Sequence, residues 1–246
     1  MNERHSVEAI ILKRWDFGEK DQIVSFFSRE KGRHQGIAKG AKASRHRFVG
    51  ALDLFCLSHL NYKEKKTSSL VMIEEARLIH GFPGIRNDYN NILLATAFLE
   101  MGYRLYKEGE GEGRGFLILK GALERLESEE ARRELFWSAL LENLEVVGLA
   151  PHFHECIRCG KDARPPFLGF DLWGGGMVCS RCSSPSSQWI EIPESLGRWL
   201  VQTETSTSPR QSLKAEDETI LDRLLRQHLK IQMDLDLEWS RFLQFF

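Results

Sequence analysis

The apolar residues of this chain change their spacing near residue 81, and this change limits the folds that the chain can adopt. Before it, short runs rich in Val, Ile and Phe are separated by turn residues or charges, which is typical of β-strands. These runs occupy residues 7–15, 21–28, 33–40, 51–62 and 68–80. No long helical pattern lies between them, so five short strands fit a small barrel better than a parallel sheet. Residues 1–80 are therefore predicted to form a five-stranded OB-fold β-barrel.

After residue 81, apolar residues recur every three or four positions, the spacing of a buried helix face. The predicted helices occupy residues 83–109, 116–128, 129–151, 193–204 and 215–236. The glycine-rich segment 108–115 is expected to be a flexible linker, and residues 205–212 a loop. The fold class is thus α+β and multi-domain, with an all-α domain in residues 81–246 following the barrel.

Four of the five cysteines form two CxxC pairs, Cys156 with Cys159 and Cys179 with Cys182, with 19 residues between the pairs. This spacing is typical of a structural zinc site, because each pair directs two thiolates at one ion and four thiolates complete a tetrahedral shell. Residues 167–178, with three glycines at the bend, are predicted to form a hairpin between the pairs. The helical domain is therefore expected to carry a four-cysteine zinc-ribbon insert at about residues 152–190, with one structural Zn²⁺ per chain.

Other interpretations of these cysteines are weaker. A disulfide needs an oxidising compartment, and no export signal is visible; a thioredoxin-like redox site uses one CxxC pair. His152 and His154 lie just upstream and are alternative ligands, although surface positions fit them better. Cys56, outside the pattern, is expected to be a small buried apolar residue.

Positive charge is concentrated in the N-terminal part. The chain has a net charge of −1, yet residues 1–80 hold 15 Lys and Arg against 10 Asp and Glu. The densest stretch, residues 37–48, contains four Lys and Arg and no acid. Such a distribution favours a polyanionic partner, although a solvated loop without a partner is the alternative.

Motifs of catalysis and membrane insertion were not found in the sequence. There is no Walker A loop, no GxSxG, no GxGxxG and no HExxH, so no enzyme is predicted. No apolar run approaches the ~18 residues of a membrane span, and the N-terminus lacks a signal-peptide pattern, so the chain is expected to be cytoplasmic and not membrane-bound.

The order of these features resembles the RecO family of bacterial DNA repair proteins. The matching stretches are "AIILKRWDFGEKDQIVSFFSREKGRHQGIAKGAKASRHRF", "GLAPHFHECIRCG" and "GGGMVCSRC". The family's AKGAR loop reads here as residues 38–42 with Lys42 in place of the usual arginine. A lysine keeps the charge but loses the bidentate guanidinium fork.

The resemblance implies a recombination mediator that binds single- and double-stranded DNA and anneals complementary strands coated by single-strand-binding protein. It further implies action with RecR in loading the RecA recombinase, and docking of the single-strand-binding protein's acidic tail on the helical domain. On this interpretation the predicted phosphate-binding residues are Lys39, Lys42, Arg45, Arg47, Arg33, Lys13 and Arg14. Phe48 and Trp15 are candidates for stacking on bases, with core positions as the alternative.

Two other functions stay open. One is a zinc-ribbon adaptor that binds a protein or RNA without annealing strands. The other is a nuclease, which needs a metal-binding carboxylate cluster that the sequence does not identify.

Overall fold

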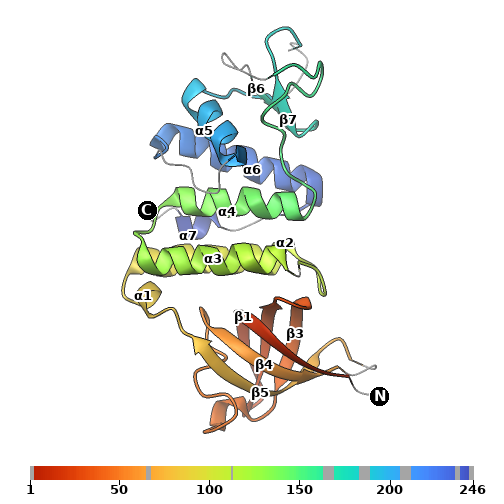
Figure 1. The fold of residues 1–246 in the computed structure, drawn as a ribbon, viewed down its shortest axis with the longest axis vertical. Helices are drawn as coiled ribbons and strands as arrows, with labels where there is room; N and C mark the ends of the chain where they lie inside the picture. The colour runs from red at the N-terminus through yellow and green to blue at the C-terminus, as the bar shows by residue number, and fades with distance from the viewer. Residues whose placement is uncertain are drawn as a thin grey trace. The chain divides into compact units, whose positions relative to one another are not determined.

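The structure is a computed structural model that describes residues 3–64, 68–111, 113–162, 169–182, 189–205, 212–235 and 239–243 (Figure 1). Its first five strands are β1 (Arg4–Phe17), β2 (Asp21–Ser28), β3 (Gly32–Ala38), β4 (Leu57–Lys63) and β5 (Val71–His80). They close into a barrel in the order β1-β2-β3-β5-β4. Strands β3 and β5 are parallel, and the other neighbouring pairs are antiparallel. The predicted five-stranded barrel is confirmed.

Alternation along the strands fills the barrel interior with apolar side chains. The interior cluster includes Val7, Ala9, Ile11, Val24, Phe26, Leu60, Tyr62 and Ile73. A register shift between Ile11 and Lys13 of β1 changes the pairing with β2. After this shift, Lys13 and Trp15 lie opposite Ser25 and Ile23.

One predicted strand begins later than expected. Residues 51–62 were predicted to be extended throughout, but β4 begins at Leu57 and residues 51–55 form turns. The apolar side chains of this segment have another purpose: Phe48, Ala51, Leu52 and Cys56 all pack into the barrel core. The β3–β4 connection therefore fills the barrel as a plug. Its apolar residues, which pack into the core, are the reason why the sequence pattern predicted a strand here.

Four helices follow the barrel: α1 (Pro83–Arg86), α2 (Tyr89–Leu105), α3 (Arg114–Ser128) and α4 (Arg133–Val146). The single helix predicted over residues 83–109 is divided, because the Asp88 carboxylate accepts a hydrogen bond from the Asn91 N–H at 3.0 Å and caps a new helix. The interruption falls between Arg86 and Tyr89.

The glycine-rich segment expected to be a flexible linker is hydrogen-bonded to the barrel. Arg33 N–H donates to Glu110 O at 3.0 Å, and Gly109 N–H donates to Arg33 O at 2.8 Å. A further bond joins Gly113 N–H to Arg29 O at 2.8 Å. A Cβ at Gly32 would lie 2.3 Å from Glu110 O, so only glycine permits this close approach.

The chain forms two compact units, one of residues 1–139 with 241–246 and one of residues 140–240. The sequence pattern changes at residue 81, whereas the first compact unit also contains α1 to α3.

The second unit contains a three-stranded sheet of β6 (Gly169–Asp171), β7 (Gly176–Val178) and β8 (Trp189–Ile190). Its main helices are α5 (Glu194–Thr205) and α6 (Ala215–Met233). The short α7 (Ser240–Leu243) follows, and its residues from 241 on belong to the first unit. Most of the loop predicted at 205–212 lies outside the described residues.

The hairpin predicted between the cysteine pairs is confirmed for residues 169–178, with β6 and β7 antiparallel, while residues 167 and 168 lie outside the described residues. Gly175 lies at its bend with φ +66°, a conformation that favours glycine. Among the described helices, none has the length and hydropathy needed to cross a bilayer.

Candidate nucleic-acid interface and metal centre

The basic loop, residues 39–47, is a hydrogen-bonded turn joined to the β1–β2 turn. It contains a short 3₁₀ helix, η1 (Ala41–Ala43), entered through Gly40 in the left-handed region at φ +68°. Gly40 N–H donates to the Asp21 carboxylate at 2.8 Å, and Lys42 N–H donates to Lys20 O at 3.1 Å. The loop therefore presents its side chains from a defined backbone.

Two of the four predicted cations of this loop hold the loop itself. Lys42 Nζ lies 3.0 Å from the Asp16 carboxylate and donates to Gly18 O at 3.1 Å. Arg47 donates to Lys39 O at 2.8 Å and to Glu74 O at 3.4 Å, and its guanidinium lies 4.8 Å from the Phe48 ring centroid. The hydrogen-bonded ion pair with Lys42, followed by a hydrogen bond from Gln22, holds the pKa of the Asp16 carboxyl below its usual value.

The other two cations, Lys39 and Arg45, are exposed to solvent. Within the described ranges, neither side chain has a hydrogen bond or ion pair. They are thus the loop cations that can contact an anion without first breaking an internal contact.

The three remaining predicted cations are held elsewhere. Arg14 forms an ion pair with Asp53 of the β3–β4 connection. Arg33 donates from Nε to Tyr106 O at 2.6 Å, and its guanidinium lies 5.2 Å from the Tyr103 ring centroid. Lys13 Nζ lies 4.8 Å from the same Tyr103 centroid. Arg33, near the start of β3, and Lys39, directly after its end, are six positions apart, which is ~20 Å of extended chain, so the seven cations do not form one cluster.

Part of the outer face of β2 and β3, which binds oligonucleotides in many OB-folds, is covered here by the helical part of the first unit. The Phe27 ring lies 4.9 Å from Tyr106 and 6.3 Å from Phe116, centroid to centroid. Lys13 and Arg33 lie at the margin of this covered face. The turns of residues 17–21 and 39–47 carry the exposed Phe17, Lys39 and Arg45.

The aromatic candidates are placed differently from each other. Phe48 is 4% exposed in the barrel core, so the core alternative is the correct one for this residue. Trp15 is half-buried with an edge contact to Tyr103 at 6.1 Å. Phe17, which was not among the predicted stacking residues, is 52% exposed at the β1–β2 turn. The sequence feature that could have identified Phe17 was its position directly before Gly18, at the end of a strand.

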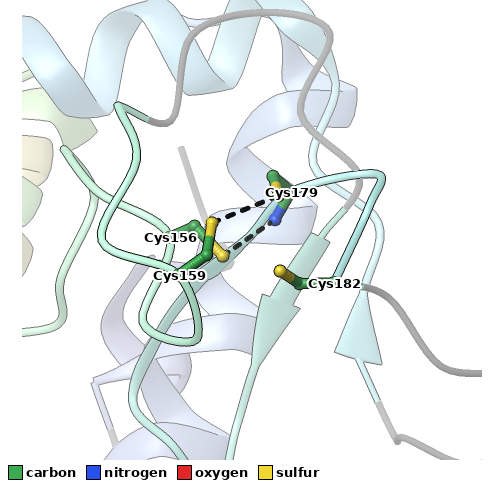
Figure 2. Close-up of side chains that lie close together, drawn as sticks. All are labelled: Cys156, Cys159, Cys179 and Cys182. Carbon is green, nitrogen blue, oxygen red and sulfur yellow. Dashed lines mark hydrogen bonds between the residues drawn. The ribbon is translucent and has the colours of Figure 1, made fainter.

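The four predicted metal ligands meet at one point in the second unit (Figure 2). Their sulfur atoms all lie within 4.8 Å of one another, and Cys159 Sγ lies 3.8 Å from Cys179 Sγ. A tetrahedron of sulfurs around an ion at ~2.3 Å has edges of about 3.8 Å. The donor set and its spacing therefore fit a tetrahedral metal ion with no open coordination position.

Each cysteine pair lies on a tight turn. Gly160 N–H donates to Cys156 O at 2.8 Å, with Gly160 at φ +66°, and Cys182 N–H donates to Cys179 O at 3.0 Å. Arg158 joins the two turns, because it donates to Cys182 O at 2.8 Å and to the Asp171 carboxylate at 3.2 Å.

Backbone N–H groups favour a thiolate at Cys156. Burial alone raises the pKa of this thiol, but N–H groups of Cys179, Arg158 and Cys159 outweigh burial and lower the pKa to about 6. The pKa of Cys182 is raised to about 12, chiefly because its thiol donates to the Cys159 sulfur. The remaining cysteine and the two nearby histidines lie outside the cluster. Burial raises the pKa of Cys56, which is 2% exposed in the barrel core as predicted. His152 and His154 are exposed, and neither belongs to the cysteine cluster.

The comparisons with known proteins agree with this arrangement. The family model "Recombination protein O N terminal" matches residues 1–82, and "Recombination protein O C terminal" matches residues 86–240. The chain belongs to the RecO family. The first match covers the barrel, and the second covers the helices and the cysteine insert.

Curated relatives from several bacteria carry the name DNA repair protein RecO. The protein from Anaeromyxobacter sp. (strain Fw109-5) is 30% identical over 93% of both chains. That from Myxococcus xanthus (strain DK1622) is 30% identical over 92% of this chain and 93% of its own. The protein from Nocardioides sp. (strain ATCC BAA-499 / JS614) is 32% identical over 91% of this chain and 93% of its own. The RecO likeness thus extends over almost the whole chain.

Proposed function

We propose that this RecO-family protein is a cytoplasmic DNA repair mediator that binds single- and double-stranded DNA by the phosphate backbone and anneals complementary strands. The observation that carries the proposal is the pair of exposed cations, Lys39 and Arg45, on an ordered loop of an OB-fold barrel. Contacts to phosphates position a strand without selecting its sequence, which is what annealing of arbitrary sequences requires.

The function of each loop residue follows from its contacts. Lys39 and Arg45 bind phosphates directly. Lys42 and Arg47 hold the loop through Gly18 O, Lys39 O and Glu74 O, and add positive potential. Phe17 offers the exposed aromatic surface on which a base of a single strand can stack.

The proposal includes no catalytic step. Holding strands by the backbone leaves the base edges free to find their complements, and the cations reduce the repulsion between two phosphate chains. In keeping with the RecO family, we propose that the protein acts with RecR and with the tail of single-strand-binding protein, and that it assists loading of RecA.

We further propose that the cysteine cluster binds zinc. Four thiolates in a tetrahedral arrangement select zinc over harder cations, and a full thiolate shell gives a structural ion. When bound, zinc supplies folding free energy to the insert, while Cys156, Cys159, Cys179 and Cys182 hold the two turns together.

A salt titration of single-stranded DNA binding tests the phosphate contacts. Replacing Lys39 and Arg45 together by alanine is expected to lower the slope of log affinity against log salt by ~1.4, at ~0.7 per contact, for all sequences alike. The Lys42/Arg47 double variant is expected to lower the slope less, since these cations are already engaged. Phe17→Ala is expected to weaken single-strand binding with an unchanged slope.

The matched control is Arg77→Ala, because Arg77 is exposed on β5 and paired with Glu75 at 3.1 Å. It is expected to leave affinity and slope unchanged. Wild-type binding by the Lys39/Arg45 variant across the titration would place the DNA path elsewhere. Absence of DNA binding by the wild type, with RNA or a protein bound instead, would favour the adaptor function.

A further inference from the structure

A second group of candidate metal ligands lies where β1 begins and β4 ends. In the antiparallel register His5 lies opposite Tyr62, and Glu64 N–H donates to Glu3 O at 2.9 Å. Glu3 directly precedes β1 and Glu64 directly follows β4. Because side chains alternate along an extended chain, Glu3 points to the same side as His5, and Glu64 to the same side as Tyr62. Tyr62 is in the barrel core, so this is the inward face.

Among the residues that the structure describes, three buried polar atoms at this end of the barrel have no hydrogen-bond partner: His5 Nε2, His34 Nδ1 and Tyr62 OH. Their rings adjoin, with centroids 5.1 Å apart for His5 and Tyr62 and 6.0 Å apart for His34 and Tyr62. Buried polar groups in native proteins almost always have a protein, water or ion partner. Of the three atoms, His5 Nε2 is the one that lies beside carboxylates, so it is the one whose missing partner a shared ligand would supply.

The carboxylates show which kind of ligand fits. His5 Nε2 lies 3.0 Å from Glu64 Oε1 and 3.9 Å from Glu3 Oε1, but neither contact has the geometry of a hydrogen bond. Donors that share a cation at ~2.1 Å are necessarily no more than about 4.2 Å apart, and both separations meet this limit. The His5 side chain is 8% exposed, whereas Glu64 is 42% and Glu3 72% exposed, which leaves the site open to ions from solvent.

We propose that Glu3, His5 and Glu64 bind a divalent transition-metal cation at this end of the barrel. One imidazole nitrogen and two carboxylate oxygens suit first-row ions such as Mn²⁺ and Zn²⁺, and water completes the shell. The site differs in chemistry from the cysteine cluster, whose four sulfurs are soft ligands. A bound cation connects the first residues of β1 with the residue after β4, and so fastens the barrel at this seam.

Manganese distinguishes the two sites. Mn²⁺ has the lowest affinity in the divalent series and prefers oxygen and nitrogen donors, so it does not displace an ion held by four thiolates. Purified full-length protein with its cysteine site zinc-loaded is titrated with Mn²⁺, and free Mn²⁺ is measured by electron paramagnetic resonance. The expected result is one bound Mn²⁺ per chain, with unchanged zinc content.

Variants locate the ion. His5→Gln and Glu64→Gln are each expected to weaken Mn²⁺ binding at least ~10-fold, since even the loss of a group that only supports a metal ligand costs ~10-fold or more. Glu75→Gln is the matched control, since Glu75 lies on β5 beside Arg77 and Asn61 and is expected to change nothing. Circular dichroism checks that each variant folds, and the half-exposed Glu64 provides the test if His5→Gln does not fold. Absence of Mn²⁺ binding by the wild type, or unchanged binding in both ligand variants, would overturn the proposal.

Discussion

The cysteine cluster and the basic loop are both irregular segments that hold functional side chains in place, but they are held in different ways. The cysteine turns carry four sulfurs within 4.8 Å of one another, and if these bind one ion, as proposed, the loss of any one affects all of them. The basic loop depends on apolar side chains in the barrel core and on separate polar contacts, each of which is weak in solvent. Loss of one cysteine should therefore unfold the whole insert, whereas loss of one contact should destabilise the basic loop only in part.

The largest expected effect follows from removal of one thiolate. Cys156→Ser is expected to abolish zinc binding and to unfold the insert, because a structural zinc site is worth ~10–16 kcal/mol of apparent binding free energy at neutral pH. Metal analysis and limited proteolysis measure this. The matched control is Cys56→Ala, which removes the one cysteine outside the cluster and should keep the metal. Purified wild-type protein that never met a chelator and yet contains no zinc would contradict the assignment.

A smaller effect is expected from the apolar anchor of the basic loop. Phe48→Ala should cost ~3–5 kcal/mol of unfolding free energy, because it empties a core position that is 4% exposed. Denaturant unfolding measures this cost. The neighbouring Val49 is 61% exposed, so Val49→Ala should change stability by no more than about 0.5 kcal/mol. Equal effects of the two substitutions would show that the loop is not anchored through the core.

The smallest effect is expected from a single polar contact of the loop. The pKa of Asp16 in the folded protein is lowered by Lys42, so the ionised carboxylate contributes stability above its unfolded pKa, and this contribution is lost as the pH falls through the folded value. Wild type should be slightly more stable than Asp16→Asn at neutral pH, and the difference should disappear once the pH is well below 3.8. If the difference in stability persisted in stronger acid, it would not arise from the ionised Asp16 carboxylate.

The sequence predicted the cysteine centre better than the basic loop, and the reason is physical. Two residues between cysteines fix how two sulfurs can face one ion, so spacing alone specified Cys156, Cys159, Cys179 and Cys182. Charge density carries no such geometry. It could not show that Lys42 is paired with Asp16, or that Arg33 lies against Tyr103 and Tyr106.

Parts of the fold were likewise predicted from the sequence, and other parts were not. Strand number and barrel closure followed from short apolar runs, but residues 51–55 have the same composition as a strand and fill the barrel as turns. The segment near Gly109 was predicted to be flexible from its glycines, yet they permit its close contact with Arg33. In both cases a long-range contact decided the structure, and such contacts are invisible in a local pattern.

The plug formed by Phe48, Ala51 and Leu52 has a consequence for temperature dependence. The loop that carries Lys39 and Arg45 leads directly into this plug. It is therefore expected to keep its conformation only while the barrel core stays packed. A ligand that binds the folded loop must raise the melting temperature of the barrel. Conversely, a destabilising substitution in the barrel core, away from the ligand, should give a temperature-sensitive protein. Such a variant should bind its ligand normally at low temperature and release it on mild warming.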